Sequence, residues 1–218
     1  MNELADKNQE VFNDFEVPDP VRIRKAIKFI KKQLPDFKNA RILECGAAKG
    51  GVADLLSREG VECVAVDINP RKFPGVRFIQ RDLNSGFPDD IGSFDVVFAG
   101  EVMEHIFNDS DFLQSARRVL KPSGFLILTV PNLLFGVNRL LMLFGQMPKF
   151  AYAPYHYHFY NKRELAGLIE EAGFEIEKIT SSHVLFSTRR NKLGAIFEWL
   201  GDVFPAFGAH LIVFAKKK

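Results

Sequence analysis

The chain has 218 residues, 47% hydrophobic and 26% charged, which is an ordinary composition for one globular domain with a single core. Its 29 basic and 27 acidic residues leave a formal net charge of +2, which gives no general electrostatic basis for binding nucleic acid. The amino terminus is polar and acidic and lacks the pattern of a secretory signal, so we expect a cytoplasmic protein. We expect residues 1–18 to be a mobile lead-in and residues 19–218 to form one domain.

The first predicted element is a helix that begins at Pro20. Asp19 is a suitable N-cap, Pro20 suits the first helical position, and Pro35 marks the end of the pattern. Six basic residues lie between its apolar positions: Arg22, Arg24, Lys25, Lys28, Lys31 and Lys32. We expect them to form a solvated face, with an anionic partner or a membrane surface as the alternative.

Short apolar runs then alternate with segments of helical spacing. The runs predict strands at residues 40–43, 61–67, 76–80, 94–99, 125–130, 174–179 and 211–215. Helical patterns occupy residues 52–56, 111–120 and 161–172, and residues 121–124 form a predicted turn. Asn161 and Glu164 have the spacing of a capping box at the start of the last of these helices. Near-continuous apolar strands that alternate with helices are typical of a parallel sheet covered on both faces.

Three acidic residues lie where three predicted strands end: Glu44, Asp67 and Asp82. Ligands of open parallel sheets bind beyond the carboxyl ends of the strands. A loop of small residues, 45–51, follows Glu44 and leads into a helix, whose N-terminus offers unpaired N–H groups to a ligand. Asp67 lies 21 residues after Gly46, a separation that suits a ribose-binding carboxylate. A single such acid is more often a helix cap or a surface group, but three in register favour a binding site.

Six motifs occur in order between about residues 38 and 180: ILECGAAKGG, AVDINP, RDLNSGFP, FDVVFAGEVMEHI, LKPSGFLILTVPN and YHFYNKRELAGLIEEAGFE. Together they resemble the class I S-adenosylmethionine-dependent methyltransferases, in particular the branch with the ubiquinone and menaquinone biosynthesis enzymes. The resemblance implies a Rossmann-like three-layer α/β sandwich. Its seven-stranded, mostly parallel sheet would have the strand order 3-2-1-4-5-7-6, with the last strand antiparallel. It also implies that S-adenosylmethionine is the cofactor and a small molecule the methyl acceptor.

The resemblance also assigns roles to individual residues. Its glycine loop, which holds the methionine part of the cofactor, corresponds to Glu44, Gly46, Ala48 and Gly50. Its ribose-binding acid corresponds to Asp67 with Ile68 beside the adenine, its adenine-binding pair to Asp82 and Leu83, and the floor beneath the sulfonium to Glu101. Ala48 departs from the pattern because the family has glycine there, and a methyl group would narrow the cofactor's approach if the backbone needs a positive φ.

The histidines are the candidate general bases. Methyl transfer from a sulfonium is an in-line displacement that depends mainly on alignment and exclusion of water, and a base with a pKa near the operating pH assists a hydroxyl acceptor. The candidates are His105, His156 and His158, each of which could instead serve packing. His156 and His158 would face the same way in an extended segment, but two histidines without a nearby third ligand do not make a metal site. Cys45 and Cys63 lack the number and spacing of a cysteine metal site and are expected to be buried, so no metal is expected.

Two segments, 132–160 and 184–207, interrupt the alternation and are the expected lid and acceptor pocket. They carry many aromatic residues: Phe135, Phe144, Phe150, Tyr152, Tyr155, Tyr157, Phe186, Phe197, Trp199, Phe204 and Phe207. One hypothesis is an apolar or lipid-linked acceptor, met at a membrane surface. The alternatives are a thick lid over a small polar acceptor, or a homodimer interface.

Two other classes of protein would use similar strand-end acids. A short-chain dehydrogenase needs Tyr-x-x-x-Lys, and none of the four tyrosines has Lys four residues later, so this class is disfavoured. A non-catalytic protein of the same fold, which binds S-adenosylmethionine or acts as a scaffold, remains the alternative to the enzyme.

Overall fold

The computed structural model describes residues 20–47, 51–70, 73–153, 155–185 and 192–218. The expected lead-in and Asp19 lie outside these ranges. The strands are β1 (Arg41–Cys45), β2 (Glu62–Asp67), β3 (Val76–Gln80), β4 (Phe94–Gly100), β5 (Leu120–Pro131), β6 (Phe174–Ser181) and β7 (His210–Lys217). The helices are α2 (Pro20–Gln33), α3 (Val52–Ser57), α4 (Asp109–Val119), α5 (Gly136–Leu143), α6 (Lys162–Glu171) and α7 (Lys192–Val203).

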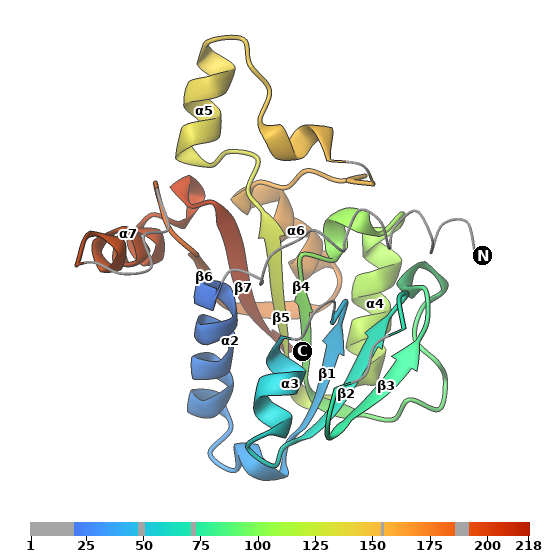
Figure 1. Cartoon of the computed structure of the whole chain (residues 1–218). Helices are drawn as coiled ribbons and strands as arrows, with labels where there is room; N and C mark the ends of the chain where they lie inside the picture. The colour runs from blue at the N-terminus through green and yellow to red at the C-terminus, as the bar shows by residue number, and fades with distance from the viewer. Residues whose placement is uncertain (1–19, 48–50, 71–72, 154, 186–191) are drawn as a thin grey trace.

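The strands form one sheet in the order β3-β2-β1-β4-β5-β7-β6, as the resemblance implies. Neighbouring strands from β3 to β5 are parallel, whereas β7 runs antiparallel to both β5 and β6. Pro131 at the end of β5 therefore pairs with His210 at the start of β7. This reversal brings the first residues of β7 to the edge where the parallel strands end (Figure 1).

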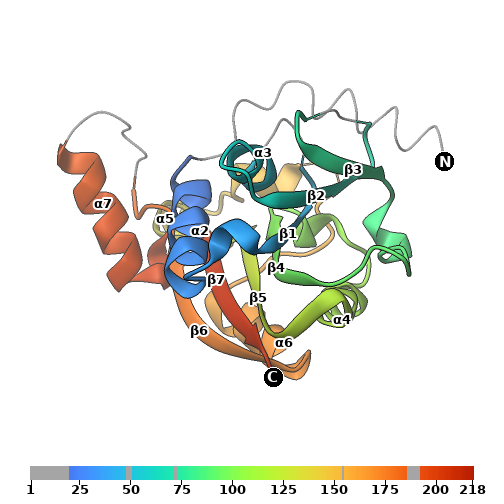
Figure 2. The same cartoon turned by 90° about the horizontal axis from the view of Figure 1, so that it is seen from below.

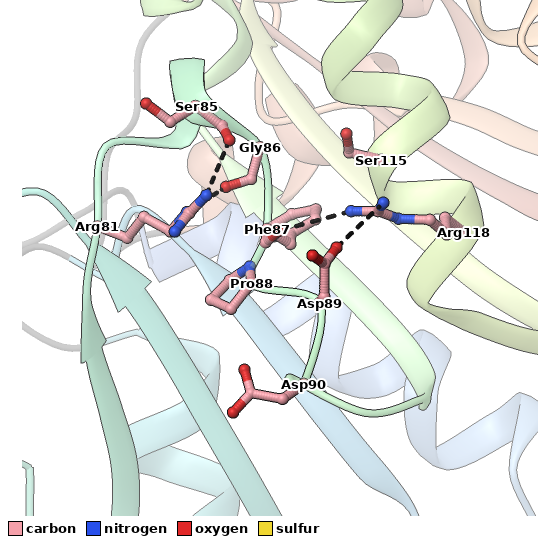
Figure 3. Close-up of a pocket in the computed structure, with 9 residues that line it drawn as sticks. All are labelled: Arg81, Ser85, Gly86, Phe87, Pro88, Asp89, Asp90, Ser115 and Arg118. Atoms are coloured by element: carbon pink, nitrogen blue, oxygen red, sulfur yellow. Dashed lines mark hydrogen bonds and ion pairs between the residues drawn. The ribbon is translucent and has the colours of Figure 1, made fainter.

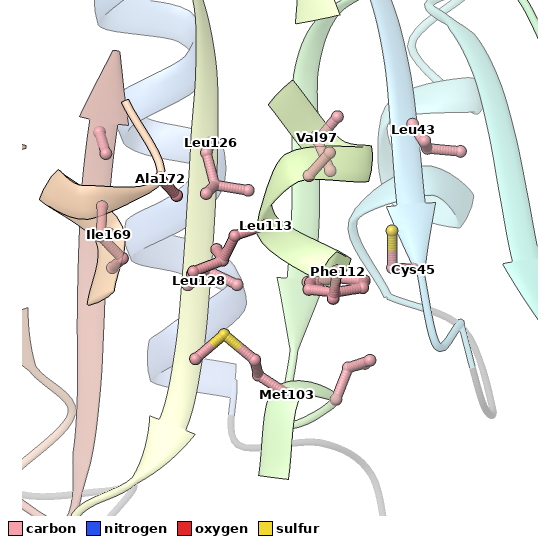
Figure 4. Packing of buried hydrophobic residues seen from close by; sticks show 14 of the residues in the cluster. Leu43, Cys45, Val97, Met103, Phe112, Leu113, Leu126, Leu128, Ile169 and Ala172 are labelled. Carbon is pink, nitrogen blue, oxygen red and sulfur yellow. The ribbon is translucent and has the colours of Figure 1, made fainter. Parts of the chain in front are cut away.

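Two apolar clusters cover the two faces of the sheet. Buried residues of α2 and α3, among them Ile30 and Leu56, pack on one face. Residues of α4 and α6, among them Leu113 and Ile169, pack on the other face and belong to the larger cluster (Figure 4). Figure 2 shows the sheet between these two pairs of helices. The three-layer architecture is therefore confirmed.

Segment 132–160 leaves the sheet after β5 and returns to it before α6. Its two ends meet, because Asn132 forms a parallel bridge with Tyr160 and Leu133 N donates to the Tyr160 carbonyl at 2.9 Å. Between them, α5 stands above the carboxyl edge of the sheet (Figure 1). The other insert contributes α7, which packs beside β6. No helix among the described residues is long and apolar enough to span a bilayer.

Of two local predictions, one needs correction and one is confirmed. Residues 121–124 were expected to be a turn, but they lie within β5 as an irregularity, where Phe94 pairs with Leu120 and Val96 with Phe125. Ser123 supplies the local reversal with a φ of 60°. The N-cap of α6 is confirmed, because Asn161 Oδ1 accepts hydrogen bonds from the backbone N–H groups of residues 163 and 164.

Candidate functional site

Glu44, at the end of β1, is buried beneath the start of α3. Its carboxylate accepts hydrogen bonds from the backbone N–H of Val52 at 3.0 Å and of Ala53 at 2.9 Å. Burial raises the pKa of Glu44 to about 7, although the two backbone donors oppose this shift. The side chain thus holds the helix N-terminus behind the glycine loop. Ala48 and Gly50, predicted members of the loop, lie outside the described residues.

Two glycines let the loop and the strand ends approach closely. Gly46 has a φ of 69°, and a Cβ there would overlap the side chain of Val102. A Cβ on Gly51 would overlap the Glu44 carboxylate, so the contact between this acid and α3 depends on glycine at position 51. The family pattern did not single out Gly51, although its place in the quoted loop is a signal.

Asp67, at the end of β2, lies among polar backbone groups. It is 7% exposed, and its Oδ1 accepts a hydrogen bond from Asn69 N at 2.8 Å. Ile68 is partly buried and its carbonyl accepts from Gln80 Nε2 at 3.1 Å. The buried Asn69 Oδ1 has no hydrogen-bond partner within the described residues. An acceptor without a partner, beside a strand-end carboxylate, suits a ligand that brings hydroxyl or amino donors.

Asp82 and Leu83 follow β3 in a tight turn. Asp82 caps the short 3₁₀ helix η2 (Leu83–Ser85), with Oδ1 accepting from Asn84 N at 2.9 Å and from Asn84 Nδ2 at 3.0 Å. Leu83 is buried in the larger apolar cluster. The helix-cap interpretation of this acid is therefore partly correct. Both hydrogen bonds from Asn84 end on one oxygen of a partly exposed carboxylate, which is compatible with a ligand at the other.

Glu101, just after β4, is held from three sides. Arg22 Nη1 lies 2.8 Å from Oε1, Thr129 Oγ1 donates to the same oxygen at 3.0 Å, and His210 Nε2 lies 3.5 Å from Oε2. The backbone at Glu101 has a φ of 56°, a strained conformation for a residue with a side chain. The next turn of the chain is the 3₁₀ helix η3 (Met103–His105).

Glu104, His105 and His156 come together beside Glu101. Their potential ligand atoms lie within 4.8 Å of one another, so the three could hold a metal ion. Glu104 is buried, and both burial and the charge of Glu101 raise its pKa well above the usual range. His105 Nδ1 lies 2.9 Å from the Tyr155 carbonyl, and burial lowers the pKa of this imidazole. The third ligand that we did not expect from the sequence is thus present in the form of Glu104.

His156 belongs to this group and His158 does not, and that the two side chains face the same way stays a prediction. His158 Nε2 lies 3.3 Å from the Phe107 carbonyl and its Nδ1 lies 3.8 Å from Asp109. His156 instead packs on the His105 ring at a centroid distance of 4.6 Å. Tyr155, directly before these residues, has a φ of 68°.

A cavity of about 580 Å³ lies between η2 and α4, away from these residues. Figure 3 shows that Arg81 and Arg118 lie on opposite sides of it. Both guanidinium groups bind the rim: Arg81 donates to the Gly86 carbonyl at 2.6 Å, and Arg118 lies 3.5 Å from Asp89. None of the predicted site residues lines this cavity, so it is not the predicted cofactor site.

Arg22 was expected on a solvated face but is buried. Arg22 is 8% exposed and reaches Glu101, while Lys25 donates to the Ser181 carbonyl at 2.7 Å and binds Asp202 at 2.9 Å. Cys45 and Cys63 are free and buried, as expected. Burial raises the pKa of both thiols, that of Cys63 to about 12, so neither is a thiolate at neutral pH.

The fold and the acids along its carboxyl edge match the pattern of the class I S-adenosylmethionine-dependent methyltransferases that the six motifs resemble. The chain belongs to the methyltransferase domain family, because a family model described as "Methyltransferase domain" matches residues 20–179. S-adenosylmethionine is therefore its cofactor.

Two curated relatives and one solved structure illustrate the similarity. A "Probable S-adenosylmethionine-dependent methyltransferase" of Mycolicibacterium smegmatis is 30% identical over 62% of this chain, which spans 52% of that relative's length. The ubiquinone biosynthesis O-methyltransferase of Xanthomonas euvesicatoria pv. vesicatoria is 26% identical over 80% of this chain and 76% of its own. The fold of the magnesium protoporphyrin IX methyltransferase from Synechocystis, with bound SAH, matches 98% of this chain and 94% of its own with a TM-score of 0.62 at 14% identity.

Proposed function

We propose that this chain transfers the methyl group of S-adenosylmethionine to a small-molecule acceptor that is apolar or lipid-linked. Binding of the cofactor is supported by a row of acids at the ends of three adjacent strands: Glu44, Asp67 and Asp82. Gly46, which has a positive φ, lies beside them. This row lies at the carboxyl edge of the sheet, where open α/β folds bind their ligands.

The residues of this edge fit the cofactor. Asp67 with the unpartnered oxygen of Asn69 would accept hydrogen bonds from hydroxyl groups of the ribose. Leu83 and Ile68 would cover the adenine, and Gly46 would let the backbone approach the methionine part. When bound, S-adenosylmethionine supplies a methyl group that its sulfonium already activates. Glu44 would hold the glycine loop in place rather than contact the cofactor, because its carboxylate already accepts hydrogen bonds from the N-terminus of α3.

The chain's own contribution to the reaction is alignment and exclusion of water. Segment 132–160, whose ends are joined at Asn132 and Tyr160, would form the lid, and segment 184–207 would complete the acceptor pocket. A base would take the proton of a hydroxyl acceptor, and His105, His156 and His158 are the candidates by position. In-line displacement then needs no other covalent chemistry from the protein.

The apolar character of the acceptor is proposed from exposed side chains on α5 and around α7. Leu143 and Phe144 are 78% and 73% exposed, and Trp199 and Phe204 are 60% and 53% exposed. Large apolar groups concentrated at the two inserts favour an apolar acceptor, with peripheral contact of the inserts to a membrane. The Xanthomonas relative, named for ubiquinone biosynthesis, supports a small-molecule acceptor. A homodimer that covers the same side chains is the alternative outcome.

Calorimetry with S-adenosylmethionine and S-adenosylhomocysteine tests the proposal. We expect both to bind, and Asp67→Ala to weaken binding at least about tenfold, since it removes two charge-assisted acceptors. Asp95→Ala is the matched control, because Asp95 lies at the start of β4 and binds Arg41 N and Lys121. Absence of binding by the wild type would reject the methyltransferase proposal. Binding without transfer of label to any component of a lipid or aqueous cell extract would favour the non-catalytic alternative.

A further inference from the structure

The cluster of Glu104, His105 and His156 joins two distant parts of the chain. Glu104 and His105 belong to η3, directly after β4, whereas His156 comes from the segment that returns from α5. The Glu104 carbonyl accepts from Tyr157 N at 2.8 Å and His158 N at 3.3 Å, so the backbone holds the two parts together. The three side chains are therefore placed by secondary structure and main-chain hydrogen bonds.

The buried carboxyl of Glu104 points to a bound cation. It is 2% exposed, and its Oε2 is buried without a hydrogen-bond partner in the described part of the chain. A buried oxygen of this kind costs about 1–3 kcal/mol when it lacks a partner. Glu101 adds a second carboxylate nearby, while Arg22 is directed to Glu101 rather than to Glu104. A metal ion would supply the missing partner and the missing positive charge.

His105 has the arrangement of a metal ligand. Its Nδ1 lies 2.9 Å from the Tyr155 carbonyl, which selects the tautomer with a proton on Nδ1 and the lone pair on Nε2. Metal-binding histidines usually donate their other ring N–H to a carbonyl or carboxylate in this way. Tyr155 presents that carbonyl from a backbone with a φ of 68°, a conformation that costs about 1–3 kcal/mol and clusters at functional sites.

We propose that Glu104, His105 and His156 bind a divalent first-row transition metal such as Zn²⁺, and that the metal's open coordination position takes an oxygen of the methyl acceptor. Two imidazoles and one carboxylate are a ligand set of catalytic zinc sites, which keep a further position open. Metal bonds of about 2.0–2.2 Å place ligand atoms about 3–4 Å apart, so the side chains must close slightly from their separation of up to 4.8 Å.

This inference rests on the proposed function and narrows the acceptor to a molecule with a hydroxyl group. A hydroxyl bound to the metal would lose its proton to water more readily, because the cation stabilises the oxyanion. Its oxygen would then form the new bond to the methyl carbon while the carbon–sulfur bond breaks, its electron pair remaining on sulfur. The acceptor leaves as a methyl ether and the cofactor as neutral S-adenosylhomocysteine. His105 and His156 would then be ligands, and no histidine of the pair would act as base.

Metal analysis of the full chain, prepared without an affinity tag, tests the proposal. After equilibrium dialysis against Zn²⁺ or Co²⁺, we expect one ion per chain. His156→Ala and Glu104→Gln should each weaken binding more than about 100-fold, because the loss of an outer-shell partner alone costs about 10–100-fold. His158→Ala is the matched control and should retain the ion, since His158 contacts Phe107 and Asp109 instead. Circular dichroism shows whether each variant is folded.

The outcomes separate this inference from the proposed function. The metal site is overturned if the wild type binds no metal, or if folded His156→Ala binds metal with the same affinity as the wild type. This holds even if S-adenosylhomocysteine binds. Chain that binds one metal ion but neither form of the cofactor would reject the methyltransferase proposal and leave the metal site in place. If the added metal lowers the rate of methyl transfer to hydroxyl acceptors while the affinity for S-adenosylhomocysteine is unchanged, the proposed role of the open coordination position is contradicted.

Discussion

Arg22 and Glu101 form an ion pair of 2.8 Å that joins the first helix of the domain to the end of β4. The guanidinium also donates to Thr129 Oγ1 at 2.9 Å, which in turn donates to Glu101. Strained backbone at Glu101 is therefore stabilised by groups from α2 and β5. Position 101 is the one that the family resemblance places beneath the sulfonium, so we infer that Arg22 is a positioning residue for this site.

Arg22→Gln should lower the free energy of unfolding by about 2–3 kcal/mol, because it leaves the Glu101 carboxylate without its cation in a mostly buried place. Arg24→Gln is the control on the same helix, since Arg24 pairs with Glu198 at the surface and should change stability by less than about 1 kcal/mol. Urea unfolding measures both values, and calorimetry measures S-adenosylhomocysteine affinity at a temperature where both variants are folded. Equal effects of the two substitutions would contradict the role of Arg22.

Gly46→Ala and Gly60→Ala separate two costs of replacing glycine. Both positions have positive φ, 69° and 87°, so each substitution should cost about 1–2 kcal/mol through the backbone. A Cβ at Gly60 meets nothing within 4 Å, whereas one at Gly46 overlaps Val102, which adds about 1–3 kcal/mol. Thermal unfolding should therefore show Gly46→Ala as the less stable variant. If Gly46→Ala also binds S-adenosylhomocysteine as well as Gly60→Ala does, the close approach of ligand at Gly46 is disproved.

Glu44 should make stability depend on pH. Its pKa is about 7 in the folded chain against an ordinary value of 4.5, so the folded state holds the proton more tightly than the unfolded state. The resulting stability is fully present below pH 4.5 and declines as pH rises from 4.5 to about 7. A difference of this size corresponds to about 3 kcal/mol across the window.

Glu44→Gln is the reference for this measurement, because glutamine cannot ionise. It replaces one of the two oxygens that accept from Val52 N and Ala53 N, which shifts stability by an amount independent of pH. Urea unfolding at several pH values should show wild type losing about 3 kcal/mol relative to Glu44→Gln between pH 4.5 and 7. A stability difference that stays constant over this range would show that Glu44 has an ordinary pKa.

The strands could be predicted almost completely from the sequence, because each contains a short run rich in apolar residues, bounded by turn residues or acids. Residues 76–80 were predicted as β3 with the bounds that the structure has. The strand order came from the family resemblance alone, since periodicity carries no information on which strands are neighbours. The turn at residues 121–124 was predicted wrongly, because those residues fit a turn pattern that β5 accommodates as an irregularity.

The candidate site could be predicted only where it follows strand ends. Glu44, Asp67 and Asp82 are recognisable because each lies at or just beyond the end of a strand, at the same edge of the sheet. Arg22 could not be distinguished from the other basic residues of α2, since six similar cations lie on this helix and only the tertiary fold buries Arg22. Glu104 and His156 are 52 residues apart, and their contact depends on how segment 132–160 returns to the sheet.

The exposed apolar side chains at the end of α5 allow a direct test of membrane contact. Leu143→Ser combined with Phe144→Ser should leave stability almost unchanged, because both side chains are mostly exposed, at 78% and 73%. Cosedimentation with vesicles of phosphatidylcholine and phosphatidylglycerol should decrease at least about tenfold, since burial of each side chain contributes about 1.5–3 kcal/mol. Leu55→Ser is the control, because Leu55 is 44% exposed on α3, outside both inserts. Absence of vesicle binding by wild type, together with conversion of a dimer to monomer by the double substitution in ultracentrifugation, would assign this face to a homodimer instead.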